Sequence, residues 1–217
     1  MNNRNQIKGL IFDLDGVLLS TDRFHYLAWK KLADRMSIRF TEKDNERLRG
    51  VSRMESLEIV LSLSEKPLAL SEEEKLAIAT EKNEQYREYL KTMTPADVSA
   101  EVRSTLATLR ERGYLLAVGS SSKNTRFILS QTALTDAFDA IADGNDIKNS
   151  KPDPEVFVKA AEFLGLEPKE CLVVEDAEAG IRAACSGKFE SAGLGEAANC
   201  STVTYALGSF GDLLRVV

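Results

Sequence analysis

The sequence predicts an α/β protein in which a doubly wound parallel sheet is interrupted after its first strand by a helical insertion. Two observations lead to this fold class. Short apolar runs alternate with amphipathic helical patterns over residues 95–217, which is typical of a parallel sheet. From residue 20 to about residue 93 the chain shows helical periodicity alone. We therefore expect a Rossmann-like core domain of residues 1–19 and 95–217, and an α-helical cap domain of residues 20–94.

The first strand is predicted at residues 10–12, an apolar run that ends in two acids, Asp13 and Asp15. Alternate residues of an extended chain project to the same side, so the two carboxylates can converge on one point. Two acids so placed repel each other, which favours a metal ion or a shared proton. The alternative interpretation is a simple turn at Gly16 that closes the strand.

Three helical patterns fill the insertion. The first begins at Thr21-Asp22, the second covers residues 54–63, and the third begins with a capping-box-like Ser71-Glu72-Glu73-Glu74. The apolar residues at helical spacing are Phe24, Leu27, Ala28, Leu32 and Met36, then Leu57, Val60 and Leu61, then Leu76, Ala79, Tyr86, Leu90 and Met93.

The rest of the core alternates between helices and strands, punctuated by glycine. Gly113 and Gly165 are natural residues to end the helices that precede them. The predicted elements are a helix at 100–112, a strand at 114–118, a short helix, a strand at 138–141, a helix at 154–164, a strand at 171–174, a helix at 177–184, and weaker strands at 189–192 and 203–205.

Composition excludes several classes of partner. The 217 residues carry a formal net charge of −6 and show no basic patch, so we expect no nucleic-acid partner. No apolar run approaches the roughly 20 residues of a membrane span, and the first residues lack the apolar segment of a secretory signal. The three cysteines show no metal-ligand spacing. We therefore expect a cytoplasmic protein with reduced thiols and no membrane partner.

Polar residues follow the predicted strands. Asp13 and Asp15 follow the first, Ser120 the second, and Glu175-Asp176 the fourth, while Lys151 follows the third across a loop. Ligands of an open parallel sheet bind outside the carboxyl ends of the strands, so these residues are expected to gather there. Carboxylate oxygens suit Mg²⁺, a lysine can hold a phosphoryl oxygen, and a carboxylate nucleophile can form an aspartyl phosphate. Taken singly, the same residues are equally consistent with a serine-rich loop, a helix entry and a charge pair at a helix N-terminus.

In order and spacing, Asp13-Leu14-Asp15-Gly16-Val17, Ser120, Lys151-Pro152 and Glu175-Asp176 resemble the four signature motifs of the haloacid dehalogenase-like phosphotransferases. The resemblance covers essentially the whole chain. Further stretches resemble the sugar-phosphate mutases of that superfamily: Thr21-Asp22 to His25, Trp29-Lys30, Gly50-Val51-Ser52-Arg53, Lys82-Asn83, Thr94-Pro95-Ala96-Asp97-Val98, Ser120 to Asn124, and Asp139 to Asp143. The chain departs from the family at Ser99-Ala100-Glu101, where a Pro-Gly pair is common, and at residues 188–191, where a more apolar strand is typical.

The resemblance implies a role for each residue of the core site. Asp13 is the nucleophile and a Mg²⁺ ligand. Asp15 is the general acid/base, contacts the substrate, and offers its backbone carbonyl to the metal. Glu175 and Asp176 complete the protein ligands of the metal. The transferring phosphoryl group is held by Ser120, Lys151 and the backbone at Ser121.

It also implies how the sugar phosphate is bound. The implied substrate contacts are Gly50, Val51 and Arg53 in the cap and Ser122, Lys123 and Asn124 in the core. A mutase must hold two phosphates, and Arg53 with Lys123 make a plausible second anion site. His25, Trp29 and Lys82 would couple cap closure, which excludes water, to substrate binding. Without the resemblance, His25 is interpreted as a helical imidazole with no role and Trp29 as a core residue.

The implied reaction interconverts β-glucose 1-phosphate and glucose 6-phosphate through an aspartyl phosphate and a bisphosphate. It belongs to carbohydrate metabolism, in the use of maltose or trehalose, and we expect a monomer. Segments Thr21-Asp22 and Thr94-Pro95-Ala96 are predicted hinges. Two alternatives stay open: a sugar-phosphate phosphatase with the same intermediate, and a non-catalytic binding protein on the same scaffold.

Overall fold

The structure is a computed structural model that describes residues 7–48, 52–66 and 68–217. It divides into two compact units, one of Met1–Ser20 with Thr94–Val217 and the other of Thr21–Met93. These limits lie one residue from the domain boundaries expected from the sequence. The functional assignment of the units as catalytic core and mobile cap stays a prediction.

In the described part of the first unit, six parallel strands form one sheet in the order β3-β2-β1-β4-β5-β6. The chain builds the sheet from β1 outwards on one side and then returns to add β4 on the other, which is the doubly wound topology predicted. The strands are β1 (Gly9–Phe12), β2 (Leu115–Gly119), β3 (Ala140–Ala142), β4 (Cys171–Glu175), β5 (Glu190–Gly193) and β6 (Tyr205–Ala206).

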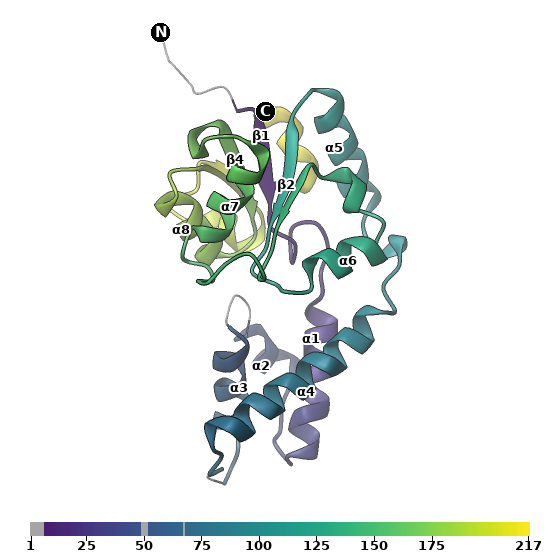
Figure 1. Ribbon diagram of the computed structural model, residues 1–217, viewed down its shortest axis with the longest axis vertical. Coiled ribbons are helices and arrows are strands. Elements are labelled where there is room, and N and C mark those ends of the chain that lie inside the picture. The colour runs from purple at the N-terminus through teal and green to yellow at the C-terminus, as the bar shows by residue number, and fades with distance from the viewer. Residues whose placement is uncertain (1–6, 49–51, 67) are drawn as a thin grey trace. The chain divides into compact units, whose positions relative to one another are not determined.

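Helices cover both faces of this sheet, with α7 and α8 on one side and α5 and α6 on the other (Figure 1). The helices are α5 (Ala100–Glu111), α6 (Thr125–Gln131), α7 (Glu155–Leu164), α8 (Glu178–Ser186) and α9 (Leu213–Val216). Short 3-10 segments lie at Pro95–Asp97, Thr135–Ala137, Pro168–Glu170, Gly195–Asn199 and Phe210–Asp212. None of the described helices is both long enough and apolar enough to cross a membrane.

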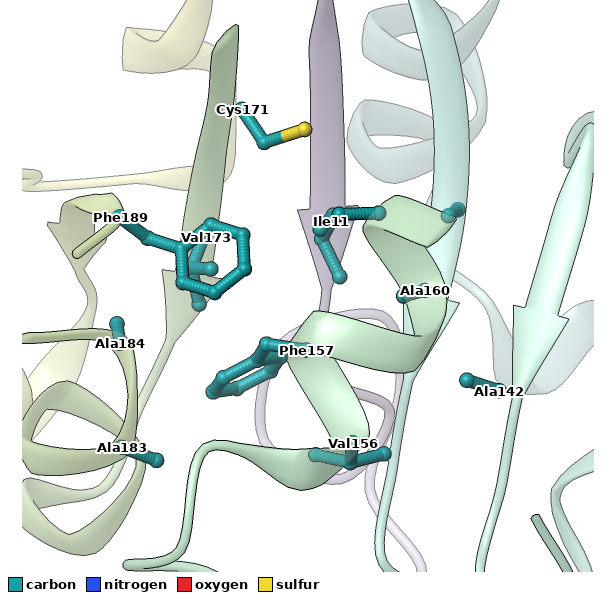
Figure 2. Packing of buried hydrophobic residues seen from close by; sticks show 12 residues of the cluster. Ile11, Ala142, Val156, Phe157, Ala160, Cys171, Val173, Ala183, Ala184 and Phe189 are labelled. Atoms are coloured by element: carbon teal, nitrogen blue, oxygen red, sulfur yellow. The ribbon is translucent and has the colours of Figure 1, made fainter. Parts of the chain in front are cut away.

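The central strand β1 is buried on both faces, because its side chains alternate between the two helical layers. Ile11 packs with Val173, Phe157 and Ala184 in the cluster beneath α7 and α8 (Figure 2). Phe12 contacts Phe138 and Phe210, with ring centroids 6.1 Å and 5.7 Å away. This burial explains why the strand reads as a continuous apolar run.

Local signals in the sequence place most element ends correctly. Gly113 and Gly165 adopt left-handed φ values of 88° and 69° after α5 and α7. At the family departure, Ser99 accepts a hydrogen bond from the Val102 amide at 3.1 Å and so caps α5 without a Pro-Gly pair. The third strand begins two residues later than predicted, because Phe138 ends a 3-10 turn.

The second unit contains α1 (Asp22–Arg35), α2 (Glu42–Glu46), α3 (Arg53–Ser62) and α4 (Glu72–Leu90), and its described residues include no strand. A capping box at Ser71 begins α4 as predicted. Trp29, Leu57 and Val60 are among the residues that form its apolar cluster. One expectation was wrong, because Leu76, assigned to the apolar stripe of α4, is 60% exposed. The five-residue α2 was not predicted.

Candidate active site

The carboxyl ends of β1, β2 and β4 bring predicted site residues of the first unit together. Phe12 pairs with Val118 of β2 and with Val174 of β4, so the residues that follow them lie at the same level of the sheet. The Asp13 amide continues this register by donating to the Val174 carbonyl at 3.0 Å. The polar strand ends therefore meet at the point where the strand order reverses, which is where open α/β sheets bind ligands.

Lys151 joins two of these carboxylates. Its Nζ donates to Asp13 Oδ1 and, at 2.6 Å, to Glu175 Oε1. It also lies 4.6 Å from the centroid of the Phe157 ring. The side chains of Lys151, Asp13 and Glu175 are only 10%, 12% and 2% exposed, so water screens their charges little. Lys151 is thus fixed beside the predicted nucleophile.

The other oxygen of Glu175 is also engaged. Oε2 accepts from the backbone amides of Asp176 and Ala177 at 2.9 Å and 3.0 Å. Both carboxylate oxygens of Glu175 therefore hold neighbouring groups: one orients Lys151 and the other shapes the chain after β4. The predicted role of Glu175 as a metal ligand stays a prediction.

Asp176 lies against the loop that follows β1. Gly16 has a φ of 84°, and a Cβ at that position would come within 1.9 Å of Asp176 Oδ2. Gly16 is therefore needed for its backbone conformation and for the room it leaves to this carboxylate. The loop is closed by a hydrogen bond of 2.7 Å from the Gly16 amide to the Leu19 carbonyl. Asp15, half-buried, begins the same loop.

The charges of the site are unbalanced. Burial, together with Glu175 and Asp15 and against the opposing effect of Lys151, raises the pKa of Asp13 to about 8. Burial and Glu175 raise the pKa of Asp176 to about 7. Although burial opposes it, contact with Asp13 and Glu175 raises the pKa of Lys151 above its ordinary value. One ammonium group thus faces several carboxylates.

This donor set fits a divalent cation with oxygen ligands, because its positive charge would offset both the burial and the neighbouring carboxylates that raise the pKa values of Asp13 and Asp176. As the side chains stand, no three acidic, histidine or cysteine residues of the described chain are grouped to hold a metal. The assignment of Asp13, the Asp15 carbonyl and Asp176 as Mg²⁺ ligands remains a prediction that the donor chemistry favours.

The predicted phosphoryl loop follows β2. Ser120 is 4% exposed, its amide donates to the Ala142 carbonyl at 3.1 Å, and its hydroxyl accepts from the Ser122 amide at 3.2 Å. The Ser122 hydroxyl accepts in turn from the Asn124 amide at 3.2 Å. Ser121 Oγ is buried and has no hydrogen-bond partner among the described residues. Lys123 is exposed and Asn124 half-buried, so this loop offers a cation and an amide.

The second unit holds its own cluster of predicted residues. Lys82 of α4 is only 5% exposed, and its Nζ lies 3.0 Å from His25 Nδ1. The same Nζ lies over two aromatic rings, 4.6 Å from the ring centroid of Trp29 and 5.0 Å from that of Tyr86. The His25 ring stacks on Tyr86 at 4.1 Å between centroids. Burial, and then the Arg53 charge, lower the pKa of Lys82 to about 7. Burial and the neighbouring Lys82 also lower the pKa of His25 well below 6.5.

Arg53 begins α3 and donates from Nη2 to Asn83 Oδ1 at 3.0 Å. Burial lowers its pKa. Gly50 and Val51, the other predicted substrate contacts of this unit, lie outside the described residues. The structure therefore brings His25, Trp29 and Lys82 together, and their contact with substrate stays a prediction.

Tyr86 was missed as a site residue. It lies beneath His25 and Lys82, and its hydroxyl donates to the buried Thr21 Oγ1 at 3.0 Å. Its helical spacing predicted only that it packs on the apolar stripe of α4. Its position four residues after Lys82, on the same helix face, is the signal that could have linked it to the cluster.

Comparisons with known proteins agree with this fold. Residues 7–186 match the family described as haloacid dehalogenase-like hydrolase. The chain is 38% identical over 190 residues to a β-phosphoglucomutase of Bacillus subtilis, covering 88% of this chain and 84% of that protein. It is 30% identical over 186 residues to a phosphorylated carbohydrates phosphatase of Thermotoga maritima, covering 85% and 83%.

A solved structure is also similar: a β-phosphoglucomutase of Clostridium difficile, with 38% identity and a TM-score of 0.86 over 96% of this chain and 93% of that one. The family match extends over most of the chain, and its residues 7–186 include the strand-end residues described above. The chain belongs to the haloacid dehalogenase-like hydrolase family of enzymes.

Proposed function

We propose that the protein is a Mg²⁺-dependent mutase that interconverts β-glucose 1-phosphate and glucose 6-phosphate. The observation that carries the proposal is the ion pair between Asp13, at the end of β1, and Lys151, in the loop between β3 and α7. It stands in a chain 38% identical to a protein named β-phosphoglucomutase. A buried carboxylate held by a lysine is a group that can accept a phosphoryl group.

In the resting enzyme of the proposed cycle, the Asp13 carboxylate carries a phosphoryl group. The 6-hydroxyl oxygen of β-glucose 1-phosphate attacks this phosphorus, the bond from phosphorus to the Asp13 oxygen breaks, and Asp15 takes the hydroxyl proton. The product is β-glucose 1,6-bisphosphate. The bisphosphate then reorients, so that its 1-phosphate faces Asp13. Asp13 attacks the phosphorus at the 1-position, and Asp15 returns its proton to the departing sugar oxygen, which yields glucose 6-phosphate.

Lys151 and the Ser120 hydroxyl would hold the equatorial phosphoryl oxygens, and Glu175 would keep Lys151 in place. Bound Mg²⁺, on Asp13, the Asp15 carbonyl and Asp176, would neutralise negative charge on the transferring group. In its absence, the raised pKa of Asp13 favours the protonated carboxyl, which is a poor nucleophile.

A mutase must also bind the phosphate that is not being transferred, and this requirement separates it from a phosphatase. Lys123 and Asn124 of the loop after β2 are the groups that we assign to that phosphate, and Arg53 is the cation of the second unit for which we propose contact with substrate. The half-buried setting of Asn124 and the exposed ammonium of Lys123 support this assignment.

The alternative is a sugar-phosphate phosphatase, in which water accepts the phosphoryl group from Asp13. It is favoured by the 30% identical relative named a phosphorylated carbohydrates phosphatase. A non-catalytic binding protein is disfavoured because the predicted nucleophile, lysine and serine are all present and gathered.

The deciding experiment supplies β-glucose 1-phosphate, Mg²⁺ and a trace of β-glucose 1,6-bisphosphate, and follows glucose 6-phosphate beside free phosphate. We expect glucose 6-phosphate to form much faster than phosphate, and Asp13→Asn to abolish both. Phosphate release without glucose 6-phosphate would establish the phosphatase instead. Inactivity of the wild-type protein toward β-glucose 1-phosphate and other phosphosugars would favour the binding protein.

We further propose that the enzyme acts in the cytoplasm on β-glucose 1-phosphate formed during the use of maltose or trehalose, and that it is a monomer. Its cysteines, Cys171, Cys185 and Cys200, are free thiols, which fits a reducing compartment. Size-exclusion chromatography with light scattering measures the oligomeric state directly.

A further inference from the structure

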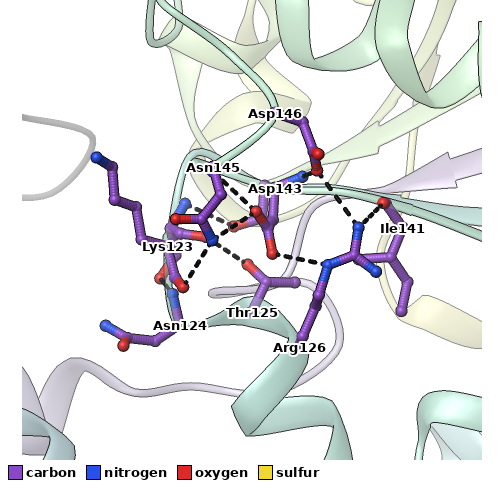
Figure 3. A network of polar contacts seen from close by, with 10 residues as sticks. Lys123, Asn124, Thr125, Arg126, Ile141, Asp143, Asn145 and Asp146 are labelled. Carbon is purple, nitrogen blue, oxygen red and sulfur yellow. Dashed lines mark hydrogen bonds and ion pairs between the residues drawn. The ribbon is translucent and has the colours of Figure 1, made fainter.

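A polar cluster in the first unit lies directly against the loop that carries Lys123 and Asn124. It is formed by Arg126, Asp143, Asn145 and Asp146, and we call it the Asp143 cluster (Figure 3). Asp143 is fully buried, immediately after β3, whereas Arg126 lies on the first turn of α6. None of these four residues has a role in the proposed reaction cycle.

Asp143 is the centre of the cluster. Its Oδ1 accepts from the amide and from Nδ2 of Asn145 at 2.8 Å and 2.9 Å. Its Oδ2 forms an ion pair with Arg126 Nε at 3.3 Å and accepts no hydrogen bond from any described residue. The Arg126 guanidinium therefore supplies the opposite charge that a buried carboxylate needs.

The same guanidinium reaches two more groups across the turn. Arg126 Nη2 donates to the Ile141 carbonyl at 2.7 Å and lies 3.4 Å from Asp146 Oδ2. Asp146 Oδ2 also accepts from the Asp143 amide at 2.9 Å. Arg126 thus fixes the turn of residues 143–146 to the helix that begins beside Asn124.

This turn is hydrogen-bonded to the backbone of the loop of residues 121–124, which carries Lys123 and Asn124. Asn145 Nδ2 donates to the Lys123 carbonyl at 3.2 Å, and the Gly144 amide donates to the Ser122 carbonyl at 3.1 Å. The contact is close: a Cβ on Gly144 would come within 2.3 Å of the Ser121 carbonyl oxygen and 2.9 Å of the Lys123 nitrogen. The turn and the backbone of residues 121–123 are therefore hydrogen-bonded to each other and packed too closely to admit a side chain at Gly144.

We propose that the Asp143 cluster is a positioning device for the distal phosphate site, which sets the placement of Lys123 and Asn124 through Asn145 and Gly144. The inference rests on the proposed function, because it takes the loop of residues 122–124 to bind the phosphate that is not being transferred. Asn145 and Arg126 act through the loop backbone and touch neither phosphate.

The test compares Asn145→Ala, Arg126→Ala and Arg126→Lys with the wild-type enzyme. The matched control is Arg182→Ala: the Arg182 side chain on α8 is 58% exposed, close to the 56% of Arg126, and its ion pair with Glu178 lies on the same helix. Loss of one or two hydrogen bonds that place a ligand group is expected to raise KM for β-glucose 1-phosphate by about five- to twentyfold. We expect kcat to change less than about twofold, since Asp13 and Lys151 are not moved.

Two further readouts separate positioning from general damage. Arg126→Lys keeps a charge near Asp143 and is expected to recover most of the KM. Phosphate release from a small acyl phosphate, which has no second phosphate, is expected to be unchanged in every variant. Amide hydrogen exchange of residues 121–125 in the ligand-free protein is expected to rise in Asn145→Ala and Arg126→Ala, and not in Arg182→Ala.

The proposal is overturned if KM or the exchange of the loop is unaffected, or if KM and kcat worsen together in proportion to a fall in Tm. A wild-type enzyme that makes no glucose 6-phosphate would reject the proposed function instead. The exchange measurement, with KM for whichever phosphosugar is hydrolysed, then still decides whether the cluster positions the loop.

Discussion

Replacing Lys82 with methionine is expected to stabilise the second unit while it impairs the enzyme. The Lys82 ammonium is buried against His25, Trp29 and Tyr86, and burial is the main cause that lowers its pKa from 10.5 to about 7. Below pH 7 the folded protein therefore holds a charged ammonium group in a buried site where water cannot solvate it. Methionine has a similar length and no charge, so it fills the site without this penalty.

The magnitude follows from the pKa difference. At about 1.4 kcal/mol per pH unit, a fall from 10.5 to 7 amounts to about 5 kcal/mol of destabilisation when Lys82 is protonated in both states. The contacts of the ammonium with the aromatic rings offset about 2 kcal/mol that methionine does not recover. We therefore expect Lys82→Met to raise the free energy of unfolding by about 3 kcal/mol at pH 6.5.

The sign of the pH dependence is also fixed. Between the folded and unfolded pKa values the unfolded chain binds more protons at Lys82, so the stability of the wild-type protein rises with pH there. The advantage of Lys82→Met is accordingly full below pH 7 and shrinks as the pH rises, and it disappears above about pH 10.5, where Lys82 is neutral in both states.

Urea unfolding, followed by tryptophan fluorescence at several pH values, measures the free energy of unfolding of both proteins. Trp29 is the one tryptophan of the chain and lies against Lys82, so its fluorescence reports on this part of the second unit. The matched control is Lys91→Met, whose side chain at the end of α4 is 59% exposed and ion-paired with Glu88. It is expected to change stability by less than about 1 kcal/mol at every pH. Destabilisation by Lys82→Met at pH 6.5, or a gain that does not vary with pH, would refute the reasoning.

Three other substitutions test the remaining contacts. Lys151→Met leaves Asp13 and Glu175 without their ammonium partner. It is expected to lower the rate of glucose 6-phosphate formation by about 10²- to 10³-fold, and a near-normal rate would contradict the role of Lys151 in holding the phosphoryl group. Gly16→Ala is expected to displace the Asp176 carboxylate and to weaken the apparent affinity for Mg²⁺ about tenfold or more in a Mg²⁺ titration of activity, while circular dichroism stays unchanged. Tyr86→Phe removes the donor to Thr21 and should lower the free energy of unfolding by about 1 kcal/mol in the Trp29 fluorescence assay, an expectation that fails if stability is unaltered.

The sequence predicts the fold class well because its signals are local. Strand β1 is buried on both faces and is therefore apolar without interruption, and Gly113 and Gly165 mark helix ends through their backbone conformation. Where a decision rests on tertiary packing, local signals fail. Leu76 has the spacing of a core residue and yet is exposed, and the five-residue α2 is too short to show a helical period.

The same distinction applies to the candidate site, where the sequence predicts which residues lie at one edge of the sheet but not the partners of their side chains. Parallel strands force their carboxyl ends to one edge, so the meeting of Asp13, Ser120 and Glu175 could be predicted from topology alone. The partners of each side chain could not, because they depend on rotamers and on loops that are distant in sequence. Asn145 holds the Lys123 carbonyl across 22 residues, and Tyr86 reaches Thr21 across 65.

Lys151 and Lys82 show what burial adds to residue type. Both are buried lysines, but Lys151 contacts two carboxylates, which raise its pKa, whereas Lys82 contacts an imidazole and two aromatic rings, and its pKa falls to about 7. The pKa of Lys151 therefore favours its charged form at neutral pH, whereas the pKa of Lys82 lies close to neutrality. If the sugar phosphate binds beside Lys82, which the family resemblance implies is a substrate contact, the negative charge of the substrate must raise the pKa of the lysine again. Substrate binding near neutral pH would then take up a proton, and the penalty that makes Lys82 unfavourable for folding would become a source of affinity for an anion.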